Sequence, residues 1–306
     1  MDNKLRSLRV AILTALPVER QEVCKHLQNL KEDIHPEGTV YWKGTFPCVD
    51  CTWDVKVAEI GSGNPRAAFE TERAISYIKP NVTLFIGVAG GVKDVQIGDV
   101  VAATTVYGYE SGKADVIFQP RPEVGSSTYR MEQRARAEAG KKDWLQRLQG
   151  RIPIPEPRVY VAPIAAGEQV ISSTSSKTYK SLRKLYSNVL AVEMEGYGFL
   201  QAVHANQLVN ALVIRGISDL IDHKSEADSK NSQELASRNA CAFAFEILAK
   251  LGRDKQFIAM IDRIKPKPKE RRHGASKSKY SITNSGQMAA GDHARMTINW
   301  HQGEPS

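Results

Sequence analysis

The chain has no run that approaches the roughly 20 consecutive apolar residues of a membrane-spanning helix, which excludes such a helix. Cysteine is scarce, with 4 among 306 residues, so no disulfide framework is expected. The N-terminal stretch MDNKLRSLRVAIL lacks a long apolar segment and a small-residue cleavage site, so we expect no secretion signal. These absences favour a reducing, cytoplasmic location.

Acidic residues are the scarcer charge, and the formal net charge is +8. The excess is local, because residues 251–280 contain ten Lys and Arg but three Asp and Glu. A basic stripe across a folded surface would indicate nucleic-acid binding. A short run such as Lys265-Pro-Lys-Pro-Lys269 is instead typical of a solvated linker, so nucleic acid is not an expected partner.

Strand-like and helix-like patterns alternate over the first 250 residues. Helical spacing predicts helices over Pro17–Leu30, Pro65–Ile78, Tyr129–Leu148, Thr178–Tyr186, Gly196–Val203 and Ser232–Leu251. Apolar runs predict strands over Val10–Leu13, Tyr41–Phe46, Thr52–Ile60, Val82–Val88, Val100–Tyr109, Val159–Ala166, Val189–Met194 and Ala211–Ile217. Strands separated by helices of this length imply an α/β sheet with crossover connections.

The pattern changes after Leu251. We predict one main domain over residues 1–251, a basic linker over 252–279 and a short interaction segment over 280–306. The last segment has too few apolar residues for a core but enough for a small hairpin. We expect it to dock on another protomer or on a sensor or adaptor protein, the alternative being a disordered end.

Two glycine-rich segments follow predicted strands. Gly61-Ser-Gly-Asn-Pro-Arg66 opens a helix, where free N–H groups bind anions or hydroxyls. A dinucleotide fingerprint is excluded because Arg66 replaces its third glycine. Phe85-Ile-Gly-Val-Ala-Gly-Gly91 ends a strand at the edge where open α/β sheets bind ligands. Each segment alone also fits a simple structural turn.

Two further segments place carboxylates at strand ends. Val192-Glu-Met-Glu-Gly196 has acceptors suited to sugar hydroxyls, although a helix N-terminus also favours acids. Arg215-Gly-Ile-Ser-Asp219 ends in a carboxyl group that partial burial would suit to general-acid chemistry, the alternative being a helix cap.

Two other patterns fail. Gly108–Lys113 is too short for a P-loop, and Ala114 replaces the magnesium-binding hydroxyl. Cys48-Val-Asp-Cys51 has no second pair at zinc spacing, so no metal site is predicted.

The order and the amino-acid sequences of these segments, over roughly residues 8–250, resemble those of the nucleoside phosphorylase/nucleosidase superfamily. The likeness is strongest to its 5′-methylthioadenosine/S-adenosylhomocysteine nucleosidase branch, with Val-Glu-Met-Glu and Arg-Gly-Ile-Ser-Asp as the specific part. The resemblance implies an α/β protein: a three-layer α/β/α domain on a mixed, partly barrel-like sheet.

The resemblance also assigns roles. Asp219 matches the general acid that protonates N7 of a purine, and Glu19 matches the carboxylate that orients the attacking water. Glu195 matches the ribose-hydroxyl acceptor, with Met194 packing on the sugar. The remaining substrate-binding positions that it implies are Glu193, Ser218, Gly63, Gly87, Val88, Ala89, Val170 and Ile171. Val170 replaces the usual aromatic residue that stacks on the base.

Hydrolysis is favoured over phosphorolysis. Superfamily phosphorylases hold inorganic phosphate with an arginine and a serine near the strand-end glycines, and those positions are Phe85 and Val88 here. Neither side chain binds phosphate, and Glu19 would repel it.

The substrate is expected to be an adenine nucleotide, most of all ATP. Lys and Arg in the motif loops would suit its phosphates, although each one alone fits a scattered surface charge: Arg66, Lys93, Lys113, Arg121 and Lys224. The segments at 70–75, 106–113 and 120–125 are similar to bacterial anti-phage effectors of this superfamily, which remove adenine from ATP. The alternatives are a methylthioadenosine-type or nucleoside hydrolase and a catalytically idle nucleotide sensor.

We therefore expect a homo-oligomeric adenine-releasing hydrolase without a cofactor. Mg²⁺ is expected only as the counter-ion of ATP.

Overall fold

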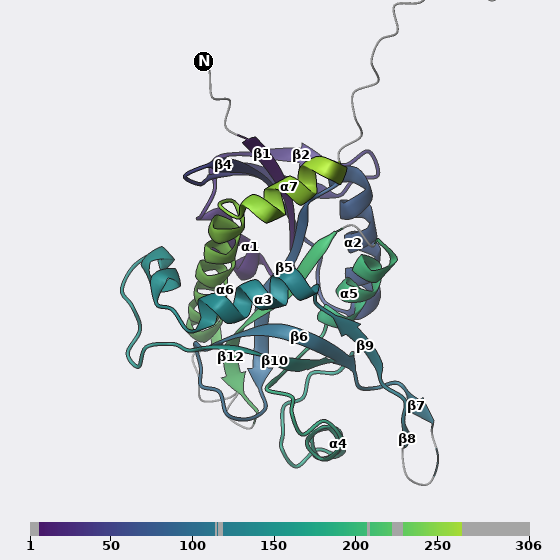
Figure 1. Cartoon of the computed structure of the whole chain (residues 1–306). Coiled ribbons are helices and arrows are strands. Elements are labelled where there is room, and N and C mark those ends of the chain that lie inside the picture. The colour runs from purple at the N-terminus through teal and green to yellow at the C-terminus, as the bar shows by residue number, and fades with distance from the viewer. Residues whose placement is uncertain (1–5, 114, 116–118, 207–208, 222–228, 265–306) are drawn as a thin grey trace, which may run out of the picture. The chain divides into compact units, whose positions relative to one another are not determined.

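A computed structural model describes residues 6–113, 115, 119–206, 209–221 and 229–264 (Figure 1). Its main strands are β1 (Arg6–Thr14), β2 (Gln28–Ile34), β3 (Val40–Pro47), β4 (Cys51–Glu59), β5 (Val82–Gly91), β6 (Val100–Gly108), β9 (Glu123–Ser126), β10 (Val159–Ala166), β11 (Ala191–Glu193) and β12 (Asn210–Leu220). Its helices are α1 (Pro17–Cys24), α2 (Asn64–Ile78), α3 (Tyr129–Ala139), α4 (Lys177–Leu185), α5 (Gly196–Ala205), α6 (Ser229–Leu251) and α7 (Lys255–Ile264).

The ten strands form one mixed sheet in the order β11-β10-β6-β12-β5-β1-β4-β3-β2, with β9 on β6. Neighbours β1, β4, β5 and β12 run parallel, whereas β12 and β6 are antiparallel. Strand β11 also pairs with β5, antiparallel at Ala191 and Gly91, so five strands close into a barrel-like ring. The predicted mixed, partly barrel-like sheet is therefore confirmed.

Alternate residues of β1 point into two apolar clusters on opposite faces of the sheet, as strand geometry requires. Val10 and Ile12 pack with α6, and Ala11 and Leu13 pack with α2 and α5. Figure 1 shows α6 and α1 together at one side, and α2 and α5 at the other. The predicted three-layer arrangement follows from this alternation.

The predicted helix over Pro17–Leu30 is wrong in its second half. Helix α1 ends at Cys24, and Gln28–Ile34 forms the edge strand β2. The side chains of β2 are nearly all exposed, so it carries no alternation of buried residues. Backbone pairing with β3 defines it instead, which a single-sequence pattern does not show.

The predicted helix over Tyr129–Leu148 also ends early. Helix α3 stops before Gly140, which occupies its C-cap, and a 3₁₀ turn follows over Asp143–Arg147. Between β6 and α3 the chain forms two short strands, β7 (Gly112–Lys113) and β8 (Gln119–Pro120), and then β9.

Helix α7 lies inside the segment predicted as a linker. Its Phe257 and Ile261 are buried, and the Phe257 ring packs beside Trp53 of β4 with centroids 6.3 Å apart. All the described residues belong to one compact unit, so the predicted domain boundary at 251 lies inside the folded unit. The rest of the linker and the segment 280–306 lie outside the described residues.

Among the described residues, no helix combines the length and apolar character that crossing a membrane requires.

Candidate active site

A pocket of ≈ 260 Å³ opens where β1, β5, β11 and β12 end. Parallel strands commonly present their ligand sites at this edge. The described residues that line it are Ala15, Leu16, Glu19, Ser62, Val88, Ala89, Gly90, Gln169, Val170, Ile171, Val192, Glu193, Met194, Glu195, Ser218, Asp219 and Gln233. Four of them are carboxylic acids, and all four were predicted from the sequence.

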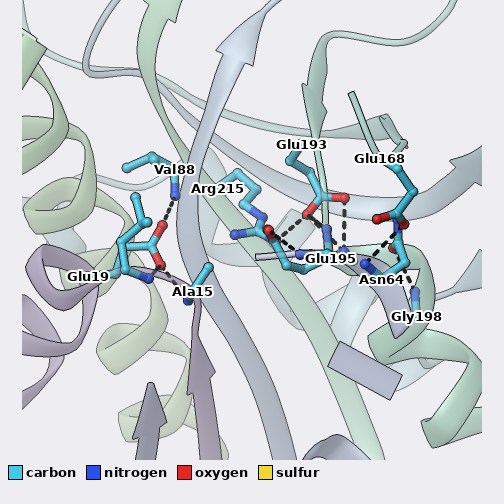
Figure 2. A network of polar contacts seen from close by, with 12 residues as sticks. Ala15, Glu19, Asn64, Val88, Glu168, Glu193, Glu195, Gly198 and Arg215 are labelled. Atoms are coloured by element: carbon cyan, nitrogen blue, oxygen red, sulfur yellow. Dashed lines mark hydrogen bonds and ion pairs between the residues drawn. The ribbon is translucent and has the colours of Figure 1, made fainter. Parts of the chain in front are cut away.

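Glu19 is fixed by three backbone N–H groups (Figure 2). Its Oε1 accepts a hydrogen bond from Val88 N at 2.8 Å, and its Oε2 accepts from Ala15 N at 2.7 Å and Leu16 N at 2.9 Å. The site arises because Pro17 begins α1 directly after β1, which brings the first turn of the helix back over the strand end. Burial raises the pKa of Glu19, opposed by Arg215 and these hydrogen bonds.

Arg215 connects the carboxylates. It is fully buried on β12, and its Nη2 donates to Glu193 and, at 3.1 Å, to Oε2 of Glu195. Figure 2 shows Arg215 between Glu19 and the pair Glu193 and Glu195. A Cβ at Gly87 would clash with Nη1 of Arg215 and would lie 2.6 Å from Oε1 of Glu19. Glycine at position 87 is therefore needed for the close packing of β5 against the charged groups.

Glu195 stands at the start of α5, where Glu193 organises the turn. The Glu193 carboxylate accepts hydrogen bonds from Glu195 N at 3.0 Å and Gly196 N at 2.9 Å. Burial, together with the negative charges of Glu193 and Glu19, raises the pKa of Glu195 to about 7 against the lowering effect of Arg215. A carboxyl group with a pKa near 7 is present in both its ionised and its protonated form at neutral pH.

Asp219 lies at the end of β12, partly exposed to the pocket. Ser218 donates from Oγ to Asp219 Oδ1 at 2.8 Å. Gly90 of β5 comes close from the other side, because a Cβ there would lie 3.5 Å from Asp219 Oδ2. The carboxyl groups of Asp219, Glu19 and Glu195 therefore border the same pocket.

The other predicted residues divide into two groups. Val88, Ala89, Val170, Ile171 and Met194 line the pocket, and Val170 exposes 65% of its surface there. Gly63 and Gly87 lie behind the lining and contact it through backbone and close packing.

The predicted cations do not line the pocket. Lys113 is on the β7–β8 hairpin, which extends away from the body in Figure 1, and pairs with Asp115 at 3.0 Å. Lys93 pairs with Asp94 at 3.6 Å, and Arg66 is exposed on α2 with its guanidinium beside Gly61. Lys224 is outside the described residues. The expected convergence of Lys and Arg is therefore absent from the described pocket lining.

Sequence reasoning missed several residues. The motif Arg215-Gly-Ile-Ser-Asp219 does not by itself indicate a role for Arg215, although a buried arginine in an apolar strand needs charged or polar partners. Leu16, Ser62, Gln169 and Gln233 were also not predicted; Gln233 comes from α6, far away in the sequence.

The carboxylates Glu138, Asp143 and Glu246 form the one group of possible metal ligands among the described residues. Lys250 lies 2.9 Å from Asp143 and 3.1 Å from Glu246, so an ammonium group already compensates their charge. None of the three lines the pocket described above.

The model of the phosphorylase superfamily matches residues 9–249, and the chain belongs to this superfamily. It is 26% identical over 255 residues to a 5′-methylthioadenosine/S-adenosylhomocysteine nucleosidase from Desulfotalea psychrophila, covering 80% of this chain and 98% of that protein. It is 30% identical over 243 residues to the ATP nucleosidase Cap17 from Escherichia coli, covering 71% of this chain and 47% of that protein. The chain thus spans about half the length of that ATP nucleosidase.

Solved structures agree on the fold. The methylthioadenosine/S-adenosylhomocysteine nucleosidase of Colwellia psychrerythraea, in complex with adenine, superimposes with a TM-score of 0.66 at 20% identity, covering 81% of this chain and 97% of that one. The Neisseria meningitidis enzyme gives a TM-score of 0.64 at 22% identity, covering 79% and 99%. These structures confirm the predicted fold, whereas the family model and the curated relatives confirm the predicted superfamily and the enzyme class, an N-glycosidic nucleosidase.

Proposed function

We propose that the chain hydrolyses the N-glycosidic bond of adenine nucleotides, with ATP as the main substrate, and releases adenine. Cleavage of this bond leaves an electron-rich base and a cation-like sugar. Asp219 protonates N7 of the leaving base, and Glu19 orients the attacking water. Glu195 accepts a hydrogen bond from a ribose hydroxyl, and Met194 packs against the sugar. The gathering of these four residues around one pocket supports the assignment.

The observation that carries the hydrolytic assignment is the position of Glu19. Its carboxylate accepts hydrogen bonds from the N–H groups of Val88, Ala15 and Leu16, which form an anion site. Inorganic phosphate would need such donors next to the sugar, and here an internal carboxylate occupies them and would repel it. Water is therefore the nucleophile.

The choice of ATP rests on the likeness to the ATP nucleosidase and on the similarity of the segments 70–75, 106–113 and 120–125 to anti-phage effectors. With it we propose a role as an anti-phage effector. A second candidate is a methylthioadenosine-type substrate, and one observation favours it. Leu16, Val88, Ala89 and Ile171 supply apolar surface in a described lining that contains no Lys or Arg. An uncharged 5′ group would fit this lining without a cationic partner.

One experiment separates the candidates. The full chain is incubated with ATP, AMP, adenosine and methylthioadenosine separately, with and without inorganic phosphate. Chromatography measures free adenine, and mass spectrometry identifies the sugar product. We expect adenine and ribose 5-triphosphate from ATP at a rate independent of phosphate, with Glu195→Gln prepared in parallel as the blank.

Three results would change the proposal. A 1-phosphorylated sugar would make the chain a phosphorylase. Faster release from methylthioadenosine than from ATP would favour the second candidate. No adenine from any of the four would favour a sensor that binds nucleotides without cleaving them.

A further inference from the structure

Asn64 joins three elements beside the pocket (Figure 2). It is the first residue of α2 and is buried, with 8% of its surface exposed. Its Oδ1 accepts a hydrogen bond from Gly198 N in α5 at 2.9 Å, and its Nδ2 donates to Oε1 of Glu168 at 2.9 Å. Its backbone N donates to the same Glu168 oxygen at 3.2 Å. One side chain therefore ties α2 to α5 and to the loop after β10.

The amide is the chemical group that this position needs. It has an acceptor at one end and a donor at the other, and Asn64 uses both. The contact leaves little room for adjustment, because a Cβ at Gly198 would clash with the carbonyl oxygen of Asn64. Alanine would remove both hydrogen bonds, and aspartate would place a second negative charge against Glu168.

The residue before Asn64, Gly63, connects these contacts of Asn64 to the active-site carboxylates. Gly63 N donates to Oε1 of Glu195 at 3.2 Å. Gly63 precedes α2 and Glu195 begins α5, so the distance between donor and acceptor depends on how the two helices are held together. We propose that Asn64 is a positioning residue, which keeps the Gly63 N–H against the Glu195 carboxylate without itself touching substrate. The contact stands on the structure alone, whereas the effect on catalysis rests on the proposed function.

The electrostatics around Glu195 make this contact measurable. Arg215 of β12 faces its carboxylate from one side, and Glu193 of β11 and Glu19 of α1 add negative charge. The hydrogen bond from Gly63 N lowers the pKa of Glu195, and the pKa is about 7 because burial outweighs this and the other lowering effects. When that bond is lost, the ionised form loses a partner and the pKa rises further. If the ionised carboxylate is the form that accepts the ribose hydroxyl, activity then begins to fall at a higher pH as the solution is acidified.

The test is a carboxyl ¹³C NMR titration of the full chain with labelled glutamate, in which Glu195→Gln assigns the Glu195 signal. In Asn64→Ala we expect the Glu195 midpoint to rise by about one pH unit, the usual effect of one lost backbone hydrogen bond. The acid limb of kcat/KM for adenine release should move in the same direction. An unchanged midpoint in a folded Asn64→Ala protein would overturn the proposal. If the wild-type chain releases no base, the proposed function fails while the titration still decides the role of Asn64.

Further variants test whether a general loss of stability, rather than the loss of this contact, moves the Glu195 midpoint. Asn239→Ala removes a different buried asparagine, whose Nδ2 donates to Gly98 O at 2.7 Å, and should leave the Glu195 midpoint unchanged. The double variant Asn64→Asp with Glu168→Gln restores an acceptor for Gly198 and a donor–acceptor pair between the two side chains. It should return the midpoint toward the wild-type value, whereas Asn64→Asp alone should not. Failure of the double variant to recover, in a folded protein, would also count against the proposal.

Discussion

At the scale of single residues, the pocket depends on one guanidinium among several carboxylates. Arg215 is fully buried and contacts Glu193 and Glu195, and it also lowers the pKa of Glu19. Removing one partner of such a cluster leaves a buried charge without compensation, which is costly. The acid that the proposed chemistry needs, Asp219, is outside this cluster and bonds Ser218 instead. Its substitution therefore tests chemistry more cleanly than that of Glu193 or Arg215.

We expect Asp219→Asn to lower kcat for adenine release by about 10²–10⁴-fold, the usual contribution of a general acid. The amide has nearly the same shape but does not supply the proton that N7 requires. Substrate affinity and thermal unfolding should remain close to wild type. The measurement is single-turnover release followed by chromatography. Asp94→Asn, an exposed carboxylate outside the pocket lining, is the matched control, and equal rates in both variants would remove Asp219 from the mechanism.

How much of the site the sequence could predict follows from the kind of contact involved. Glu19, Glu195 and Asp219 stand in local motifs at strand ends, so their meeting in one pocket could be expected. Asn64 and Arg215 act through partners far away in the chain: Gly198 for one, Glu193 and Glu195 for the other. Their roles become visible only when the helices and strands are placed in space.

At the scale of elements, α7 shows how a boundary is misjudged. Its apolar residues Phe257 and Ile261 are spaced for one face of a helix, but the basic residues that follow made the whole stretch resemble a linker. Strand β2 shows the opposite case, because its exposed side chains carry no pattern and only pairing with β3 defines it. Local composition predicted the central strands well because they are buried on both faces.

We expect Phe257→Ala to lower the free energy of unfolding by about 3 kcal/mol, as for other buried phenylalanines. The ring is fully buried and packs beside Trp53 near the start of β4, at the end of the sheet opposite the pocket. Adenine release per folded molecule should therefore stay unchanged. Denaturant unfolding measures the first effect, and exposed Gln256→Ala is the control. A loss below about 1 kcal/mol would mean that α7 contributes little to the folded unit.

At the scale of the whole molecule, the described pocket lining is acidic, whereas the positive charge is concentrated in one segment of the sequence. The described lining contains four carboxylates and neither Lys nor Arg, while most of the net charge of +8 is in residues 251–280. A triphosphate would meet repulsion from these carboxylates unless its phosphates extend away from them. Adenine release from ATP in this pocket therefore requires a bound geometry in which the phosphates lie outside the described lining.

The last prediction concerns residues 265–306, which we propose serve assembly rather than chemistry. They include Ile282, Met288, Met296, Ile298 and Trp300, apolar residues that gain stability from a partner surface. A chain ending at Ile264 retains all the described elements, so it should fold and release adenine at the full-length rate in vitro. We expect the truncated chain to form smaller oligomers, with fewer subunits by light scattering, or to lose activation in infected cells. The double variant Ile298→Ser and Trp300→Ser keeps the chain length and should reproduce that loss. If the truncated and full-length chains agree in the number of subunits, the rate and the cellular response, the segment has no assembly role.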